Sequence, residues 1–297
     1  MIPATTTAMP MASSSPPALL VAEQVQRNRR AWLLQVLLVT TVLALLGLLL
    51  GVLLALLTGA WTAWPGIGLG VGLAAAVLLT NLVPGLGEQL ALQRVAASPS
   101  DPERQPRLHN LAEGLCEKAG LPVPSLYLVD SAAANAFAVG RDPAHSAIVV
   151  TSGLLDVLNR VELEGVVAHE LAHVRSRGAR LASATVVLGG LPGLLRERDG
   201  GGARAAAAAL LAPLAPTLLR LGAQPRRLLD ADQSAAYLTR YPPGLASALR
   251  KLAATGGPLP GRPGLDHLWL VAPEPPTPGA APTHPPLEER LAALRDL

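Results

Sequence analysis

Residues 161–177 read VELEGVVAHELAHVRSR, and they contain the pattern HELAH at positions 169–173. On a helix, His169 and His173 lie one turn apart on the same face, so both imidazoles can bind one metal ion. Zinc accepts such nitrogen ligands. Glu170 adjoins the first ligand and can take the proton of a zinc-bound water while the ion polarises a substrate carbonyl. The stretch therefore predicts peptide hydrolysis assisted by one zinc ion.

An HExxH pattern also recurs by chance in ordinary amphipathic helices, so the flanking residues matter. Asn159 and Glu162 have the spacing of a capping box, which would start a helix at this point. The same stretch supplies an apolar surface through Leu163, Val166, Val167, Leu171 and Val174. A buried helix that carries two histidines and a glutamate needs a reason, because unpaired polar groups are costly inside a protein.

The composition is typical of a membrane protein with one modest catalytic domain. Half of the 297 residues are hydrophobic and 15% are charged, whereas soluble domains carry about a quarter. The net charge of +3 gives no basic patch, so we expect no nucleic-acid partner. Cys116 is the single cysteine, so no internal disulfide can form and zinc would have to use histidine and carboxylate ligands.

An uncharged run of residues 31–87 predicts a transmembrane helical hairpin over residues 27–87. We expect spans at about residues 32–57 and 64–83, after a disordered tail of residues 1–26. A cleaved signal peptide is the alternative for the first span, but the apolar run is too long and a second span follows at once. Arginines at both ends of the hairpin place them in the cytoplasm: Arg27, Arg29, Arg30 and Arg94.

Small residues recur at helical spacing in both spans. Gly47 and Gly51 lie in the first, and four glycines at positions 66, 68, 70 and 72 lie in the second. Such residues let helices approach closely, either within the hairpin or between two copies of the chain. The sequence leaves the oligomeric state open.

The rest of the chain predicts an α+β catalytic domain in two parts, residues 88–180 and 223–297. After a linker at 98–106, the first part should hold a helix at 107–119, strands near 125–130, 131–140 and 145–151, and a short helix at 153–158. Residues 181–222 form a second apolar helical pair, whose crossing of the bilayer stays open. The second part should hold a helical pair at 226–252, a strand at 267–271 and a helix at 287–297.

The chain resembles the HtpX-like integral-membrane zinc metallopeptidases, which are gluzincins related to the CAAX-prenyl protease type. The resemblance runs from about residue 30 to the C-terminus. The matching motifs stand in the family's order and are Asn135-Ala136-Phe137-Ala138, Gly153-Leu154-Leu155, Glu162-Leu163, HELAH at 169–173, Ala231-Asp232, Ala235-Ala236 and THPPLEER at 283–290. Together they are far more specific than HExxH alone.

This resemblance implies a mostly helical, zincin-like domain with a small sheet in a bacterial-type cell membrane, facing the cytoplasm. It implies that His169 and His173 bind zinc, and that Glu170 acts as general base and then as proton donor. Asp232 would accept a hydrogen bond from a ligand histidine. The strand Asn135, Ala136 and Phe137 would pair with an extended polypeptide substrate.

Two positions depart from the family's pattern. The family's third ligand, a glutamate, falls at Leu228, and leucine cannot bind zinc. Asp230 lies about 200 degrees round the helix from Leu228, so it could ligate only if the helix were distorted or the alignment with the family were shifted by two residues. Asp232 could turn toward the metal, but it lies one turn away and has a short side chain. Gly178-Ala179-Arg180 stands where the family has a polar Asn/Asp pair.

Three functions follow from these observations. The first is a membrane-bound zinc metalloendopeptidase that hydrolyses membrane or misfolded proteins. The second is a weakened or inactive pseudopeptidase that serves as a membrane binding or scaffold protein, because position 228 is leucine. The third, a membrane protein with a chance HExxH, would require several spaced motifs to be accidental.

Overall fold

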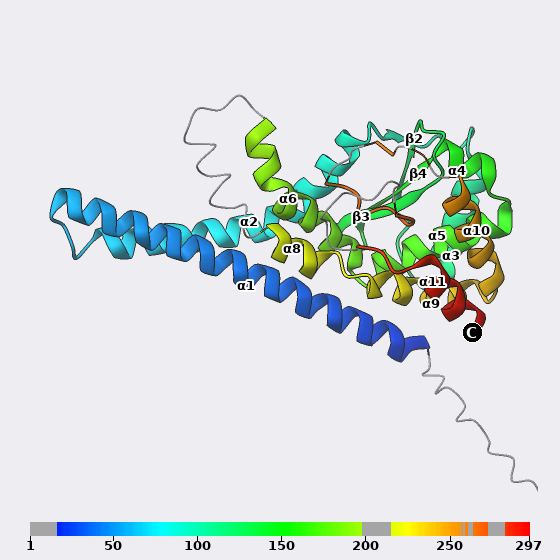
Figure 1. Cartoon of the computed structure of the whole chain (residues 1–297), viewed down its shortest axis with the longest axis horizontal. Coiled ribbons are helices and arrows are strands. Elements are labelled where there is room, and N and C mark those ends of the chain that lie inside the picture. The colour runs from blue at the N-terminus through cyan, green and yellow to red at the C-terminus, as the bar shows by residue number, and fades with distance from the viewer. Residues whose placement is uncertain (1–16, 198–214, 256, 258, 261–263, 273–282) are drawn as a thin grey trace, which may run out of the picture.

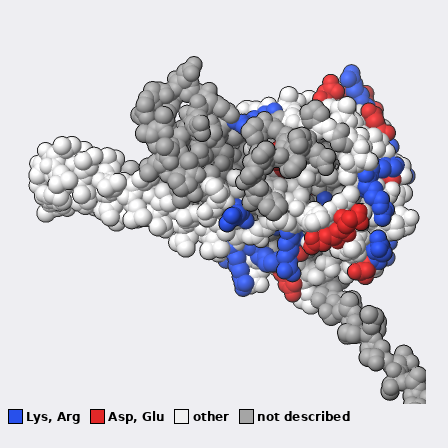
Figure 2. Space-filling view, viewed as in Figure 1, with Lys and Arg blue, Asp and Glu red and all other residues white. Residues whose placement is uncertain are grey.

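The structure is a computed structural model that describes residues 17–197, 215–255, 257, 259–260, 264–272 and 283–297. Two long helices, α1 (Pro17–Thr58) and α2 (Trp64–Arg94), form a hairpin that projects from the rest of the protein (Figure 1). Both are long and apolar enough to cross a membrane. The far end of the hairpin shows no charged residue, whereas Lys, Arg, Asp and Glu gather on the opposite part of the molecule (Figure 2). The predicted hairpin is therefore confirmed.

Helix α1 extends well beyond the expected span at its N-terminal end. It begins at Pro17, so the prediction of a disordered tail to residue 26 is wrong from that residue onward, and residues 1–16 lie outside the described part. The reason is contact with the catalytic domain. Gln24 Nε2 donates to the backbone oxygen of Asp230 at 2.9 Å, and Asn28 Nδ2 donates to Ser176 O at 2.9 Å.

The two helices of the hairpin meet through their glycines. A Cβ atom on Gly68 would overlap the backbone oxygen of Gly47 and lie 3.0 Å from the Cα of Gly51. A Cβ atom on Gly72 would overlap Leu43 O. Gly66 and Gly70 face open space in the described structure. The two helices therefore pack through four glycines, at positions 47, 51, 68 and 72, as expected for close backbone approach.

We expect Gly68→Val to destabilise the hairpin, because the new side chain must force two backbones apart. Overpacking of this kind costs about 1–3 kcal/mol. Gly70→Val is the matched control, since it adds the same side chain two residues away in open space. The measurement is the thermal unfolding midpoint of both variants in detergent. Equal midpoints would contradict the packing described here.

The catalytic domain is built on a four-stranded sheet in the order β1-β2-β4-β3. The strands are β1 (Ser98–Pro99), β2 (Ser125–Val129), β3 (Ala136–Asp142) and β4 (His145–Thr151). β2 pairs with β4 in parallel, and β3 pairs with β4 antiparallel. The three longer strands were predicted. β1 was not, because two residues in a Pro-rich stretch carry no periodic pattern, and they are ordered by pairing with Tyr127 and Leu128.

Helix α5 (Arg160–Arg175) carries the HELAH residues through the centre of this domain. The predicted capping box is present: Glu162 N donates to Asn159 Oδ1 at 3.0 Å, and Asn159 N donates to Glu162 Oε2 at 2.9 Å. Helices α3 (Pro106–Ala119) and α4 (Ser152–Val157) also lie where the sequence placed them. α5 contacts α3, β3 and two helices of the second part, α9 (Arg226–Thr239) and α10 (Pro242–Ala254). Helix α5 is buried on nearly all sides, so its polar residues Glu162, His169 and Glu170 are enclosed by the protein.

The second apolar region contains α6 (Gly178–Glu197) and α8 (Ala215–Gly222), which lie beside α1 and α2. Residues 198–214 between them are outside the described part. Among the described helices, only α1 and α2 satisfy the length and hydropathy of a membrane span.

The C-terminal part brings α11 (Leu287–Arg295) onto α9 and α10. The prediction of a strand at 267–271 is wrong, because these residues form turns and bends. They still lie along the edge of the sheet, since Leu270 N donates to Ala136 O at 2.8 Å.

Candidate active site

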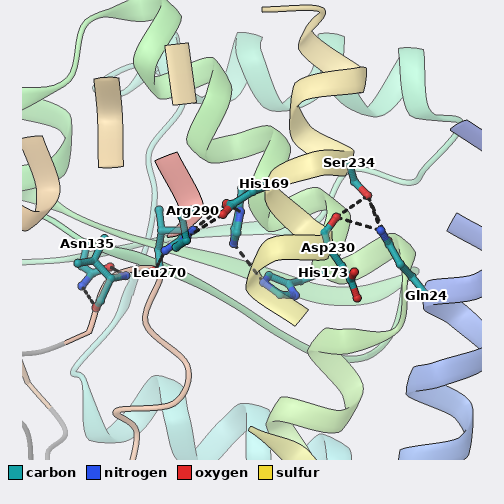
Figure 3. Close-up of polar contacts among 10 residues, drawn as sticks. Gln24, Asn135, His169, His173, Asp230, Ser234, Leu270 and Arg290 are labelled. Carbon is teal, nitrogen blue, oxygen red and sulfur yellow. Dashed lines mark hydrogen bonds and ion pairs between the residues drawn. The ribbon is translucent and has the colours of Figure 1, made fainter. Parts of the chain in front are cut away.

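His169 and His173 converge as the helical spacing predicts. Their Nε2 atoms lie 3.2 Å apart, and His169 is fully buried (Figure 3). Two nitrogens bound to one tetrahedral zinc at about 2.1 Å would lie about 3.4 Å apart. The observed separation is therefore close to that of two ligands of a single ion.

Asp232 orients His169, as the resemblance implies. Its Oδ1 lies 2.8 Å from His169 Nδ1, and both side chains are buried. Asp232 is held in turn by Arg290, whose Nε and Nη2 each donate to one carboxylate oxygen at 2.7 Å. The third nitrogen, Nη1, donates to Leu270 O at 2.6 Å. At this distance the ionised Asp232 favours the tautomer of His169 that carries its proton on Nδ1, which leaves the Nε2 lone pair toward His173.

The charge states in the site follow from burial and from Arg290. Burial lowers the pKa of His169 and lowers that of His173 further, so both imidazoles are neutral and can act as ligands. Burial alone would raise the pKa of Asp232, but the guanidinium of Arg290 outweighs it and holds that pKa below its usual value. Asp232 is therefore ionised at neutral pH.

Glu170 lies within the same enclosed region. Its side chain is 1% exposed, its Oε1 has no hydrogen-bond partner, and the backbone N–H of Ala138 donates to its carboxylate. Burial raises the pKa of Glu170 to about 8 in the protein without a metal. A buried carboxylate oxygen without a partner is a group that a metal, a water or a substrate can satisfy.

The third ligand position is apolar. Leu228 is buried, lies one turn before Asp232 on α9, and lines the same small cavity as His173. Asp230 does not replace it, because its carboxylate forms an ion pair with Arg27 at 2.5 Å. Figure 3 shows Asp230 on the side of α9 that faces Gln24. Within the described residues, no three His, Cys, Asp or Glu side chains come together as a metal site. The residues present therefore fit two ligands of a zinc ion and do not complete the usual three.

The predicted substrate strand has internal partners along its outer edge. Asn135 bonds both backbone groups of Val271. Asn135 Nδ2 donates to Val271 O at 2.8 Å, and Val271 N donates to Asn135 Oδ1 at 3.1 Å. Ala136 O accepts from Leu270, and Phe137 packs edge-to-face on Trp269 at 4.8 Å between ring centroids. A substrate that pairs with this edge must therefore replace the contacts of residues 269–271.

A cavity of about 1070 Å³ lies beside this edge. Its described lining includes Asn135, Val271, Asp232 and Arg290, together with apolar residues of α10 and α11. It does not reach His169 or His173 in the described structure. Its size is that of a site for a large ligand or a short peptide segment.

Two further histidines, His284 and His267, lie in the second part of the domain and have different surroundings. His284 Nε2 bonds Trp269 O at 2.7 Å, which is a structural contact. His267 lines the small cavity beside His173, and its Nε2 lies 3.3 Å from Ala182 O. The sequence did not identify Arg290 as the partner of Asp232. The one signal was physical: a buried aspartate needs a buried cation.

Comparison with known proteins agrees with this geometry. Residues 102–297 match the model of peptidase family M48. A "Protease HtpX homolog" of Dictyoglomus turgidum is 42% identical over 213 residues, 65% of this chain and 70% of that protein. Another, of Acaryochloris marina, is 38% identical over 275 residues, 84% of this chain and 92% of that protein. The family match covers more than half of the chain and includes every residue of the site described above. The chain therefore belongs to peptidase family M48 and is, by that membership, a membrane metalloprotease similar to HtpX.

Proposed function

We propose that the chain is a membrane-bound zinc endopeptidase in which His169 and His173 hold one zinc ion and Glu170 handles the proton. The observation that carries this proposal is the convergence of the two Nε2 atoms, with Asp232 fixing the orientation of His169. When bound, zinc polarises a peptide carbonyl and makes water more acidic. The pair of imidazoles would hold such an ion less tightly than three ligands.

The chain's own residues would divide the remaining work. Glu170 would accept a proton from water and donate it to the leaving nitrogen, a role that contributes typically 10²–10⁴-fold. Its enclosure by the neighbouring core excludes bulk water from that proton. The edge of β3 from Asn135 to Phe137 would pair with an extended polypeptide once residues 269–271 give way.

We further propose that the catalytic domain faces the cytoplasm and acts on membrane or misfolded proteins. The arginines at the open end of the hairpin support this orientation by the positive-inside rule. The hairpin places the domain next to the bilayer, where membrane-embedded and unfolded chains would be within reach (Figure 1).

A second candidate function is a pseudopeptidase that binds polypeptides without cutting them. Leu228 supports it, because an apolar side chain lies where the family has a ligand. The cavity of about 1070 Å³ beside Asn135 supports it as well, since it could take a polypeptide segment without using the two histidines.

The test is the zinc content of the purified, detergent-solubilised protein beside a His173→Ala control. We expect about one zinc per chain in the wild type and a loss in the control. We also expect hydrolysis of an unfolded protein such as casein that disappears in Glu170→Gln. Absence of zinc after zinc is supplied would overturn the peptidase proposal. Binding of unfolded protein that is unchanged in Glu170→Gln would then support the pseudopeptidase.

A further inference from the structure

A small cavity of about 20 Å³ adjoins His173, and its wall includes Gly178, Arg227 and Leu228. A cavity of this volume is slightly larger than the space that one water molecule needs. It can therefore receive one oxygen atom of a small polar group. The peptidase function proposed above makes no use of it.

Arg227 brings a positive charge to this cavity, and two of its nitrogens make no hydrogen bond within the described residues. Its Nε and Nη1 atoms are inaccessible to solvent and have no hydrogen-bond partner. The acid that acts on it is Asp230, whose carboxylate is bonded to Arg27 at 2.5 Å. Burial lowers the pKa of Arg227 to about 10, so it remains a cation at neutral pH. Arg227 is partly exposed, but a buried donor without a partner is costly, and an anion that accepts from Nε and Nη1 would relieve that cost.

Gly178 borders the cavity on the side of His173 that faces away from His169. It is the first residue of α6, and a Cβ atom placed on it would lie 3.1 Å from His173 Nδ1 and 3.3 Å from Ser176 Oγ. Because the Nε2 of His173 faces His169, its Nδ1 faces the Gly178 side. A histidine that binds metal commonly donates its other N–H to a carboxylate.

The first turn of α9 completes the wall. Gln224, Arg227 and Leu228 line the cavity at the point where α9 begins. The N-terminus of a helix carries a partial positive charge that favours anions. Gln224 is exposed, so this side of the cavity lies next to solvent.

We propose that the cavity between His173, Gly178 and Arg227 is a carboxylate-binding subsite. The carboxylate would accept hydrogen bonds from Nε and Nη1 of Arg227 and from Nδ1 of His173. It would thereby support His173 from the side opposite His169, as Asp232 supports His169. The ligand is a carboxylate from a small free acid or from the C-terminus of a peptide, and the subsite does not require that the histidine pair hold zinc.

The experiment titrates formate, the smallest carboxylate, into the full-length protein in detergent with a chelator present, and follows the thermal unfolding midpoint. Formamide at the same concentration is the neutral control of equal shape. We expect formate and not formamide to raise the midpoint of the wild type. We expect the response to vanish in Arg227→Met, which removes the charge.

Gly178→Asp keeps the test decisive if Arg227→Met does not fold. This variant supplies its own carboxylate beside His173 and Arg227, so its midpoint should no longer respond to formate. Gly114→Asp is the matched control, because it adds the same side chain on α3 in open space, and it should retain the formate response. An absent response in the wild type, or an equal response in Gly178→Asp, would overturn the subsite.

The source of the carboxylate is distinguished by competition. A short peptide with a free C-terminus, but not its C-terminal amide, should displace ¹³C-formate if a chain end is the natural ligand. Displacement by acetate alone assigns the subsite to small free acids. A protein that binds formate but no zinc would retain the subsite and lose the peptidase proposal, so the two failures are distinguishable.

Discussion

Leu228→Glu is expected to increase the affinity of the protein for zinc at least about 100-fold. The expectation follows from the position of Leu228, which is buried on α9 one turn before Asp232, where the family's pattern has its glutamate ligand. A carboxylate there would add a third ligand to the two convergent imidazoles. Changing a residue that only orients a ligand alters metal affinity 10–100-fold, so a direct ligand should reach at least the upper end of that range.

The measurement is zinc affinity by competition with a chelator of known strength, beside Leu228→Met as the apolar control of similar volume. The stability of the two variants gives a second readout, whose order should differ without and with zinc. Without metal, the buried glutamate should make Leu228→Glu less stable than Leu228→Met, because its charge has no partner. Added zinc should reverse that order, since a ligand that binds only the folded state stabilises it. Equal zinc affinity in both variants would mean that position 228 does not face the metal.

Local patterns in the sequence predicted much of this fold. The absence of charge over residues 31–87 predicts the membrane hairpin, because an apolar run of this length is typical of segments that cross a bilayer. The capping box of Asn159 and Glu162 fixed the start of α5, and helical geometry alone brought His169 and His173 together. These features depend on residues that are close in sequence, so they are accessible without a structure.

Contacts between distant segments were not accessible in the same way. Residues 17–26 were expected to be disordered, yet they continue helix α1, and Gln24 donates to Asp230 O on α9 beside the ion pair of Arg27 with Asp230. The edge of β3 was expected to pair with substrate, yet Ala136 O on this edge already accepts a hydrogen bond from Leu270 N. Asp232 was expected beside a ligand histidine, but its second partner, Arg290, lies 58 residues later in the chain. No periodicity encodes such pairings, because they follow from how the helices pack.

Arg290→Met is expected to lower the free energy of unfolding by about 3–5 kcal/mol, the usual cost of breaking a buried ion pair by removing one partner. Arg290 is 2% exposed and Asp232 is 1% exposed. Both carboxylate oxygens of Asp232 accept hydrogen bonds from Arg290, and Arg290 Nη1 donates to Leu270 O. Loss of the guanidinium would leave a buried carboxylate next to His169 with its charge uncompensated.

The pH dependence identifies the charge as the cause. The pKa of Asp232 is held below its usual value, so the pair stabilises the protein above the unfolded pKa of about 3.9. That contribution is lost as pH falls through the lower folded value. The deficit of Arg290→Met should therefore be complete at pH 7 and smaller in acid. Chemical unfolding at both pH values, beside Arg104→Ala at an exposed pair that should stay near wild type, measures this difference.

Combining Arg290→Met with Asp232→Asn separates the charge from the packing. The double variant should be more stable than Arg290→Met alone, because the amide carries no charge that needs a partner. If the double variant were instead as unstable as the sum of both single variants, packing of the Arg290 side chain against Leu270 and α9 would be the main contribution. In either case the geometry of His169 depends on Asp232, so zinc affinity should fall 10–100-fold in Asp232→Asn. The C-terminal helix α11 would then support the metal site structurally, although it supplies neither of the two ligands, His169 and His173.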